Sequence, residues 1–278
     1  MPSHRARHAR DREYWLARLP SLPLAPELPT VERSTAAPPS FRRHALTLPP
    51  QRWAAFRAQA GARRVTPSGA VLAAFSQTIE RWSRQPAFCL TVTVLSRPPL
   101  HADVGRIVGD FTSVNLLEVR HAPGAPFDDA ARALQQRLWE DLEHAAFGGV
   151  EVLRELAREH RRRDLIMPVV FTSTLGIDGA TDAGDGEFMR GARLGYGITQ
   201  TPQVWLDCQA AERGGALHLN WDVRDGVFAP GTVEDAFASF AALLERLADD
   251  ASAWGAADPL ELPLATREQR RRVNDTAA

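Results

Sequence analysis

The chain has 278 residues, and its 33 basic and 34 acidic side chains leave a formal net charge of -1. A charged fraction of 24% and a hydrophobic fraction of 44% are typical of a soluble globular protein rather than a disordered one, and a near-neutral chain is not expected to be a dedicated nucleic-acid binder. The sequence contains no lysine, which excludes a Schiff-base lysine and a phosphate-loop lysine.

Cysteine and histidine usage excludes several further classes of site. Cys89 and Cys208 lie far apart and form no CxxC pair, so neither a disulfide framework nor a thiolate zinc site is expected. No histidine pair has zinc-binding spacing, and no GxSxG nucleophile motif is present. The N-terminus lacks the apolar core of a signal peptide, and no stretch reaches the roughly 20 apolar residues of a membrane span. We therefore expect a cytoplasmic protein that binds neither a metal nor a membrane.

The first elements in chain order are a helix, a connector, a strand and a second helix. Apolar residues at helical spacing predict a helix at residues 11–19, which Pro20 ends. Six prolines within residues 20–39 predict an extended connector that lies across a surface. A strand at residues 41–48 and a helix at residues 51–60 are expected next.

The middle of the chain carries stronger signals. Thr66 followed by Pro67 is a helix N-cap signal, and apolar residues continue at helical spacing as far as Trp82. FCLTVTVL at residues 88–95 is rich in β-branched residues and predicts a central strand. The elements expected after it are strand-like residues at the end of 109–119 and helices at 127–144 and 150–161.

The last third of the chain predicts several strands and one long helix. Seven glycines in residues 176–197 predict a long mobile loop, and the polar tail from Trp254 predicts a linker rather than a core element. The other elements expected are strands at 167–175, around Thr199, at 203–210 and at 216–221, and a helix at 233–247. Strands mixed with helices throughout indicate an α/β or α+β fold, without an internal repeat.

Two segments place polar groups where the pattern predicts core. Thr172 and Ser173 end the apolar strand PVVFTSTL, and Asp207 falls within the strand that contains Val204 and Leu206. A buried aspartate is costly without partners, and burial raises its pKa toward the range where it can exchange protons near neutral pH. The alternative is that Asp207 faces water or braces a turn, and the pattern alone favours neither.

The order of several motifs resembles that of heterocyclization domains of nonribosomal peptide synthetases. TPQVWLD, which ends at Asp207, is followed fourteen residues later by Trp221-Asp222, as in the signature of that family. The other segments similar to family motifs, in the family's order, are LPLAPELP at 22–29, TPSGAVLAAFSQTIERWS at 66–83, GDFTSVNLL at 109–117, QQRLWEDLEH at 135–144 and PVVFTSTLG at 168–176. The resemblance extends from about Tyr14 to the end of the chain.

The resemblance implies the fold and the domain organisation. The family belongs to the condensation superfamily, whose two lobes resemble chloramphenicol acetyltransferase and enclose a tunnel. Neither the DxxxxDxxS motif of the family's N-terminal lobe nor the related HHxxxDG motif is present. We therefore expect an α/β C-terminal lobe, a mixed sheet flanked by helices, at residues 41–253. Residues 1–40 are expected to form the N-terminal helix and the proline-rich connector between the lobes, and residues 254–278 resemble the linker to an adenylation domain.

The resemblance also implies a reaction and the residues that carry it. A carrier-bound acyl donor condenses with carrier-bound cysteine, serine or threonine, and cyclodehydration then gives a thiazoline or oxazoline. The family's catalytic residues match Asp207, as proton shuttle, and Thr172, which orients Asp207 or binds the carbonyl-derived oxygen. The supporting residues are expected to be Gln203, Ser173 and Thr91. Thr91 departs from the family, because asparagine is common at that position.

The same resemblance implies the partners. These are the N-terminal lobe of the same domain, the donor and acceptor peptidyl carrier proteins and an adjacent adenylation domain. The substrates would arrive on the phosphopantetheine arms of the carriers, and no cofactor is expected in this chain. The alternative to an enzyme lobe is a non-catalytic lobe that docks carrier or adenylation domains. An acyltransferase of the same superfamily would require the histidine motif that is absent.

Overall fold

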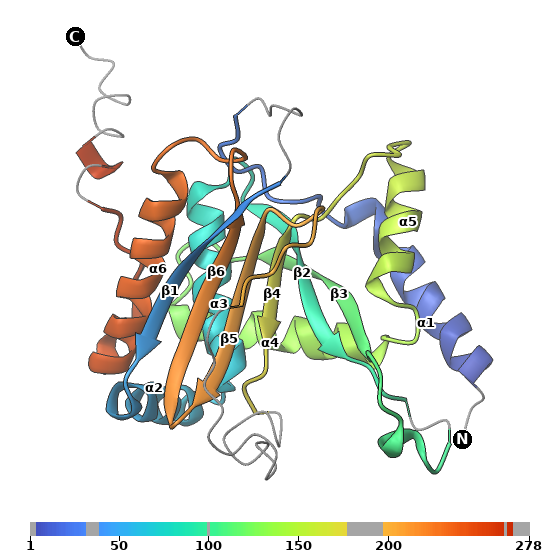
Figure 1. Ribbon diagram of the computed structural model, residues 1–278, viewed down its shortest axis with the longest axis horizontal. Helices are drawn as coiled ribbons and strands as arrows, with labels where there is room; N and C mark the ends of the chain where they lie inside the picture. The colour runs from blue at the N-terminus through green and yellow to red at the C-terminus, as the bar shows by residue number, and fades with distance from the viewer. Residues whose placement is uncertain (1–3, 32–38, 99–100, 177–196, 264–265, 269–278) are drawn as a thin grey trace.

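The protein is described by a computed structural model that covers residues 4–31, 39–98, 101–176, 197–263 and 266–268, and these residues form a sheet with helices on both faces (Figure 1). The strands are β1 (Phe41–Leu48), β2 (Ala87–Leu95), β3 (Thr112–Arg120), β4 (Val169–Ser173), β5 (Leu206–Arg213) and β6 (Ala216–Arg224). The helices are α1 (His4–Arg18), α2 (Pro50–Ala62), α3 (Pro67–Trp82), α4 (Phe127–Glu143), α5 (Gly149–Glu159) and α6 (Thr232–Asp249), with short 3-10 helices at Leu19–Ser21, Val104–Arg106 and Ala251–Gly255.

The sheet is mixed, as predicted, and its strand order is β1-β6-β5-β4-β2-β3. β4 lies in the middle and runs parallel to both of its neighbours, β2 and β5. The remaining pairs, β2 with β3, β5 with β6 and β1 with β6, are antiparallel. The two segments singled out in the sequence therefore lie on neighbouring parallel strands, with VVFTS on β4 and LDCQ on β5.

One face of the sheet packs against α2, α3, α4 and α6 to form the larger hydrophobic core. Helix α3 is buried along almost its whole length, because small and apolar residues follow one another around it. It begins as the sequence predicts, since the hydroxyl of Thr66 accepts a hydrogen bond from the backbone of Gly69 at 3.0 Å and Pro67 occupies the first turn. Aromatic rings of Phe75, Phe171 and Trp221 meet at the centre of this core.

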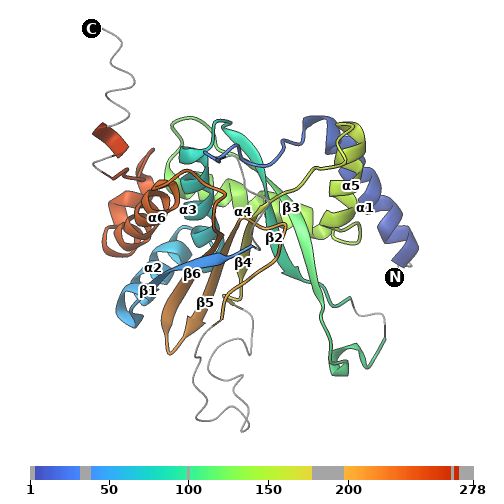
Figure 2. The same ribbon diagram turned by 45° about the horizontal axis from the view of Figure 1, so that its top comes forward.

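A second, smaller hydrophobic core lies on the opposite face, where α1 and α5 cover β2 and β3. Figure 2 shows α1 and α5 together on the side of the molecule away from α2 and α6. Because side chains alternate along a strand, the neighbours Leu116 and Leu117 of β3 point into different cores. Trp15, Leu19 and Leu22 join this second core, so the N-terminal helix and the beginning of the proline-rich connector are part of the folded unit.

Three predictions about local structure are wrong. Residues around Thr199 do not form a strand, and β5 starts at Leu206 rather than at residue 203. The reason is a turn in which the carbonyl of Thr201 accepts a hydrogen bond from the backbone N–H of Val204 at 3.0 Å. Pro202 lies within this turn and has no N–H to donate to a neighbouring strand. The first helix also begins earlier than expected, at His4 rather than at residue 11.

The C-terminal segment differs from the expected linker at its beginning. Trp254 is fully buried and Leu260 nearly so, and both belong to the larger core. The indole of Trp254 contacts the rings of Phe56 and Phe127. Core-forming residues therefore extend past residue 253, where the sequence pattern places the start of the linker. The loop predicted at residues 176–197 lies mostly outside the described residues.

Among the residues described here, no helix is both long enough and apolar enough to cross a membrane.

Candidate active site

A cavity of about 900 Å³ opens on the face of the sheet that carries α5. Its floor is formed by alternate residues of the central strands, and apart from Val170 these are polar: Thr91, Thr93, Thr172, Asp207 and Gln209. Its wall is formed by α5 and the segment after it, where Leu153, Ile166 and Met167 are apolar. The cavity thus combines an apolar wall with a few convergent polar groups, the usual composition of a small-molecule site.

Thr172 and Asp207 are hydrogen-bonded to each other on the floor of this cavity. In the parallel pairing of β4 with β5, Asp207 lies opposite Val170, two residues before Thr172, so all three side chains share one face. The hydroxyl Oγ1 of Thr172 donates to Oδ1 of Asp207 at 3.3 Å. The structure therefore brings together the two residues that the sequence singled out as catalytic candidates.

Asp207 is 5% exposed, and its burial decides between the two interpretations left open by the sequence. It neither faces bulk water nor braces a turn, because it lies within β5 and lines the cavity. Removal from water is the largest influence and raises the pKa of the Asp207 carboxyl, and the negative charge of Asp222 adds to this effect. Hydrogen bonds from Gln209, Thr199 and Thr172 act in the opposite direction and lower the pKa. A carboxyl with a raised pKa is suited to give and take protons.

The pair belongs to a polar row that crosses five strands. On one side, Thr93 of β2 and Thr172 of β4 share a hydrogen bond of 2.9 Å. A hydroxyl has one hydrogen, so when Thr172 donates to Asp207 the hydroxyl of Thr93 is the donor to Thr172. On the other side, Gln209 of β5 donates to Asp207 at 2.8 Å, and the row continues through Asp222 of β6 to Arg43 of β1.

Thr93, Gln209 and Arg43 are site residues that were not predicted from the sequence. A signal for the first two was present, because each lies two residues from a site position on a predicted strand, Thr93 from Thr91 and Gln209 from Asp207. Arg43 could not have been found in this way, because it reaches the site only through the pairing of β1 with β6.

The three predicted supporting residues differ in their placement. Thr91 lines the cavity, and its hydroxyl donates to the backbone carbonyl of Met167 at 3.1 Å. Gln203 lines the cavity from the turn before β5 and is exposed. Ser173 is not brought to the cavity, because it follows Thr172 directly and so points to the other face of β4. There its hydroxyl accepts a hydrogen bond from Ser68 at 2.9 Å.

Both cysteines are free and buried. Cys208 follows Asp207 but lies in the larger core on the opposite face of β5, and burial raises the pKa of its thiol. Cys89 is buried in the second core, and burial likewise raises the pKa of its thiol. Neither thiol is therefore a candidate nucleophile. Within the described part of the chain, no cluster of three or more histidine, cysteine, aspartate or glutamate side chains could hold a metal ion.

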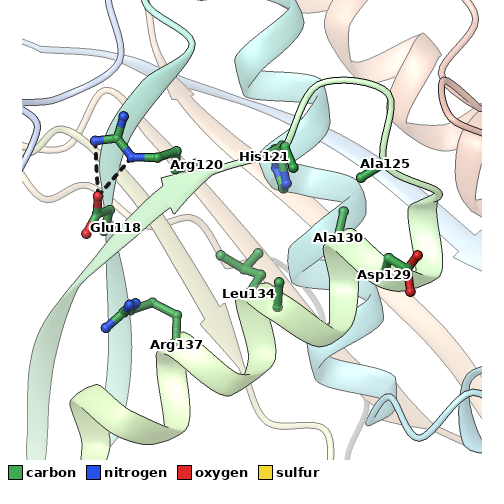
Figure 3. Close-up of a pocket in the computed structure, with 10 residues that line it drawn as sticks. Glu118, Arg120, His121, Ala125, Asp129, Ala130, Leu134 and Arg137 are labelled. Carbon is green, nitrogen blue, oxygen red and sulfur yellow. Dashed lines mark hydrogen bonds and ion pairs between the residues drawn. The ribbon is translucent and has the colours of Figure 1, made fainter.

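A second pocket, of about 490 Å³, lies between the end of β3 and α4 (Figure 3). Alanine side chains and Leu134 form much of its lining, and Arg120 pairs with Glu118 at its rim. His121 is the buried titratable group of this pocket, and burial lowers the pKa of its imidazole to about 4. A histidine that stays neutral at physiological pH and ion-paired side chains at the rim give this pocket no acid or base comparable with Asp207.

Comparison with known proteins identifies the class to which this fold and site belong. The family model of the condensation domain matches residues 3–256. The chain is 46% identical over 257 residues to pyochelin synthetase PchF of Pseudomonas aeruginosa and 40% identical over 268 residues to phenyloxazoline synthase MbtB of Mycobacterium tuberculosis. These matches cover 91% and 96% of this chain but only 14% and 19% of the two synthetases.

Solved structures show the same relationship. The cyclization-docking bidomain of EpoB, a nonribosomal peptide synthetase of Sorangium cellulosum, superposes with a TM-score of 0.77 at 37% identity. The superposition covers 90% of this chain and 50% of that chain. The protein therefore belongs to the condensation-domain family. Its predicted resemblance to the C-terminal lobe of heterocyclization domains and its mixed sheet flanked by helices are both confirmed.

Proposed function

We propose that this chain is the C-terminal lobe of a heterocyclization domain that forms thiazoline or oxazoline rings. In this proposal a carrier-bound acyl donor is condensed with carrier-bound cysteine, serine or threonine, and the product is then cyclised with loss of water. The observation that carries the proposal is the hydrogen bond between Thr172 and Asp207 on the polar floor of the cavity. The printed name of the relative MbtB, phenyloxazoline synthase, supports the same class of product.

The ring-forming stage requires two proton transfers that one carboxyl group can perform in turn. The side-chain thiol or hydroxyl adds to the new amide carbonyl, forming a carbon–sulfur or carbon–oxygen bond, and its proton is transferred to the carbonyl oxygen. Loss of water then breaks the bond from carbon to that oxygen, while the N–H proton leaves and a C=N bond forms. Asp207 would accept a proton in each transfer and return it to the departing oxygen.

Thr172 and the cavity wall have separate roles in this proposal. The Thr172 hydroxyl orients Asp207 through its hydrogen bond, or turns to bind the carbonyl-derived oxygen when substrate is present. The apolar wall keeps water away from the reacting carbon and keeps the pKa of Asp207 raised. Thr91 takes the position at which the family commonly has asparagine, and its hydroxyl is bound to the Met167 carbonyl rather than directed to Asp207.

The partners in this proposal follow from the substrates. The N-terminal lobe of the same domain would supply the other wall of the tunnel, and donor and acceptor carrier proteins would deliver the substrates on phosphopantetheine arms. An adenylation domain would follow the tail of the chain. The cavity lies on an open face of the lobe between α5 and the central strands, which leaves it accessible to such partners.

The test is reconstitution with carrier-bound acyl donor and carrier-bound cysteine, with and without an N-terminal lobe, followed by mass analysis. Ring formation predicts a product that is one water lighter than the condensed amide, formed only when both lobes are present. Asp207→Asn is expected to lower the ring-forming rate by about 10²- to 10⁴-fold, the usual contribution of a general acid–base group.

Two results would contradict the proposal. Full ring formation by Asp207→Asn would exclude the proton shuttle. Failure of the wild-type lobes to form even the linear amide, with binding of the carriers retained, would favour a lobe that only docks its partners.

A further inference from the structure

Two buried carboxylates face each other across the polar row. Asp207 of β5 and Asp222 of β6 are directly paired in the register of their antiparallel strands, and they are 5% and 1% exposed. Like charges directly opposite each other on neighbouring strands repel. A group that separates the two carboxylates is therefore needed for both to be held in fixed positions.

The amide of Gln209 occupies this place. Gln209 follows Asp207 by two residues on β5, so both side chains leave the same face of the strand. Its Nε2 donates to Oδ2 of Asp207 at 2.8 Å and lies 3.4 Å from Oδ2 of Asp222. The same nitrogen also contacts the hydroxyl of Thr199. An amide offers two donor hydrogens without a charge, so it can bind both carboxylates and adds nothing to the charge of the site.

Asp222 is held in place independently of Gln209. The guanidinium of Arg43 donates two hydrogen bonds to its two carboxylate oxygens, each 2.6 Å long, and the backbone N–H of Thr199 donates a third at 2.6 Å. A bidentate pair of this kind fixes both the charge and the orientation of the carboxylate. The Nε2 atom of Gln209, which donates to Asp207, thus also contacts a carboxylate that is held in a rigid ion pair.

The other charged groups that face Asp207 come from the opposite wall of the cavity. They are Arg154 of α5 and Arg163 and Asp164 of the segment after it, and all three are exposed to solvent. Water screens these charges, whereas the charges of Asp222 and Arg43 act from within the sheet. The hydrogen bond from Gln209 and the facing charge of Asp222 are therefore two local influences on the pKa of Asp207. Each of them can be removed by a single substitution without removing the other.

We infer that Gln209 is a positioning residue, whose amide ties the Asp207 carboxylate to the Asp222–Arg43 ion pair and keeps its other oxygen directed to Thr172 and the cavity. The two oxygens of Asp207 are then used differently, because Oδ2 is bound by Gln209 and Oδ1 is left for Thr172 and the substrate. The role of Oδ1 toward the substrate rests on the proposed function. The hydrogen bond from Gln209 to Oδ2 of Asp207 is a property of the folded chain and does not depend on that function.

The first test needs no substrate. Gln209→Met keeps the length of the side chain and removes both donors, so the ionised form of Asp207 loses a hydrogen bond and its pKa should rise. The titration of Asp207 is followed in the full chain by ¹³C NMR of labelled aspartate carboxyls, with Asp207→Asn to assign the signal. Gln136→Met, on the exposed face of α4, is the matched control and should leave the titration unchanged.

A second variant distinguishes a specific effect on the pKa of Asp207 from a general loss of structure. Asp222→Asn removes the negative charge that faces Asp207, so the pKa of Asp207 should fall, in the direction opposite to Gln209→Met. Shifts in opposite directions would not arise from general loosening of the sheet. An unchanged Asp207 titration in a folded Gln209→Met chain would overturn the inference.

The second test measures ring formation in the reconstituted two-lobe domain as a function of pH. Gln209→Met should move the acid limb of the profile, where Asp207 becomes protonated, to higher pH and lower the rate on that side by roughly tenfold, as expected for one hydrogen bond to a charged group. A fall in rate with an unmoved acid limb would reduce Gln209 to a structural role. If the NMR titration moves and the rate profile does not, the positioning of Asp207 stands and the proposed catalytic use of Asp207 fails.

Discussion

Single hydroxyl and carboxyl groups carry the proposed chemistry, and each is held by its neighbour. Asp207 receives hydrogen bonds from Thr172 on one oxygen and from Gln209 on the other, so its orientation is fixed before a substrate arrives. Such preorganisation is what an acid–base group requires, since a misdirected carboxyl transfers protons slowly. Substitutions that keep shape and remove one donor should therefore affect rate far more than stability.

Thr172→Val provides such a substitution. Valine has nearly the same shape but no donor, so the ionised Asp207 loses one hydrogen bond and ring formation should slow by roughly tenfold. The measurement is the single-turnover rate of water loss from the linear amide in the reconstituted domain. Ser173→Ala is the matched control on the same strand, since this side chain faces away from the cavity, and it should retain the wild-type rate.

His121 shows what burial does to a titratable group outside the site. It is buried against α3, where Nε2 lies 3.0 Å from the Ser76 hydroxyl, and its pKa of about 4 lies below its ordinary value of 6.5. Between these two pH values the unfolded chain binds a proton that the folded chain does not. The free energy of unfolding should therefore fall as the pH falls from 6.5 toward 4, by up to about 3 kcal/mol from this residue.

This pH dependence is measured by denaturant unfolding at several pH values. His121→Gln should flatten the decline between pH 6.5 and 4 relative to the wild type. His101→Gln changes an exposed histidine and should leave the decline as it is. Equal slopes in the wild type and His121→Gln would show that His121 is not the group responsible.

Among the elements, α5 sets the shape of the cavity, and its first residue sets the position of α5. A Cβ added to Gly149 would lie 2.5 Å from the carbonyl oxygen of Val114 on β3, which is closer than atoms can approach. The glycine therefore lets the helix lie directly on the strand. Leu153 and Ala157, one and two turns later, then form part of the cavity wall.

Gly149→Ala should push α5 away from β3. The expected cost is about 1–3 kcal/mol of unfolding free energy, as for other overpacked sites, together with slower ring formation because the wall moves. Gly148→Ala is the control one residue earlier, where a Cβ would meet Ser113 at an ordinary 3.6 Å. It should cost less than about 1 kcal/mol, because alanine is only a poorer N-cap than glycine. Equal losses in the two variants would contradict the close packing at Gly149.

At the scale of the whole molecule, the larger core is closed by residues near the C-terminal end of the described chain. Trp254 lies between Phe56 of α2 and Phe127 of α4, and its indole N–H donates to the carbonyl of Leu247 at 2.8 Å. Leu260 is buried in the same core. These contacts join segments that are almost 200 residues apart in the sequence.

A chain that ends at residue 253 should therefore be less stable than one that ends at residue 268. Loss of Trp254 alone corresponds to about 3–5 kcal/mol, the usual cost of removing a buried tryptophan side chain. Thermal unfolding of the two truncated chains, compared with the full chain, measures the difference. Equal midpoints for all three chains would show that the segment after residue 253 does not contribute to stability.

The sequence predicts the site better than it predicts the surroundings of the site. Thr172 and Asp207 could be found because each interrupts an apolar strand with a polar group, and the family motifs place them together. The ion pair of Asp222 with Arg43 could not be found, because it depends on the pairing of β1 with β6, which no local pattern specifies. The burial of Trp254 was not predicted for a related reason. Prolines and charged residues surround it in the sequence, and the core residues that it contacts are far away along the chain.

The second core has a practical consequence for exchanging parts between synthetases. Trp15, Leu19 and Leu22 pack there with Val152 and Leu156 of α5, the helix that walls the cavity. A recombination junction placed at residue 40, between the connector and β1, would give the recipient a lobe whose cavity helix has lost its contacts with Trp15, Leu19 and Leu22. A junction placed ahead of α1 would transfer the helix, its partners and the cavity as one unit.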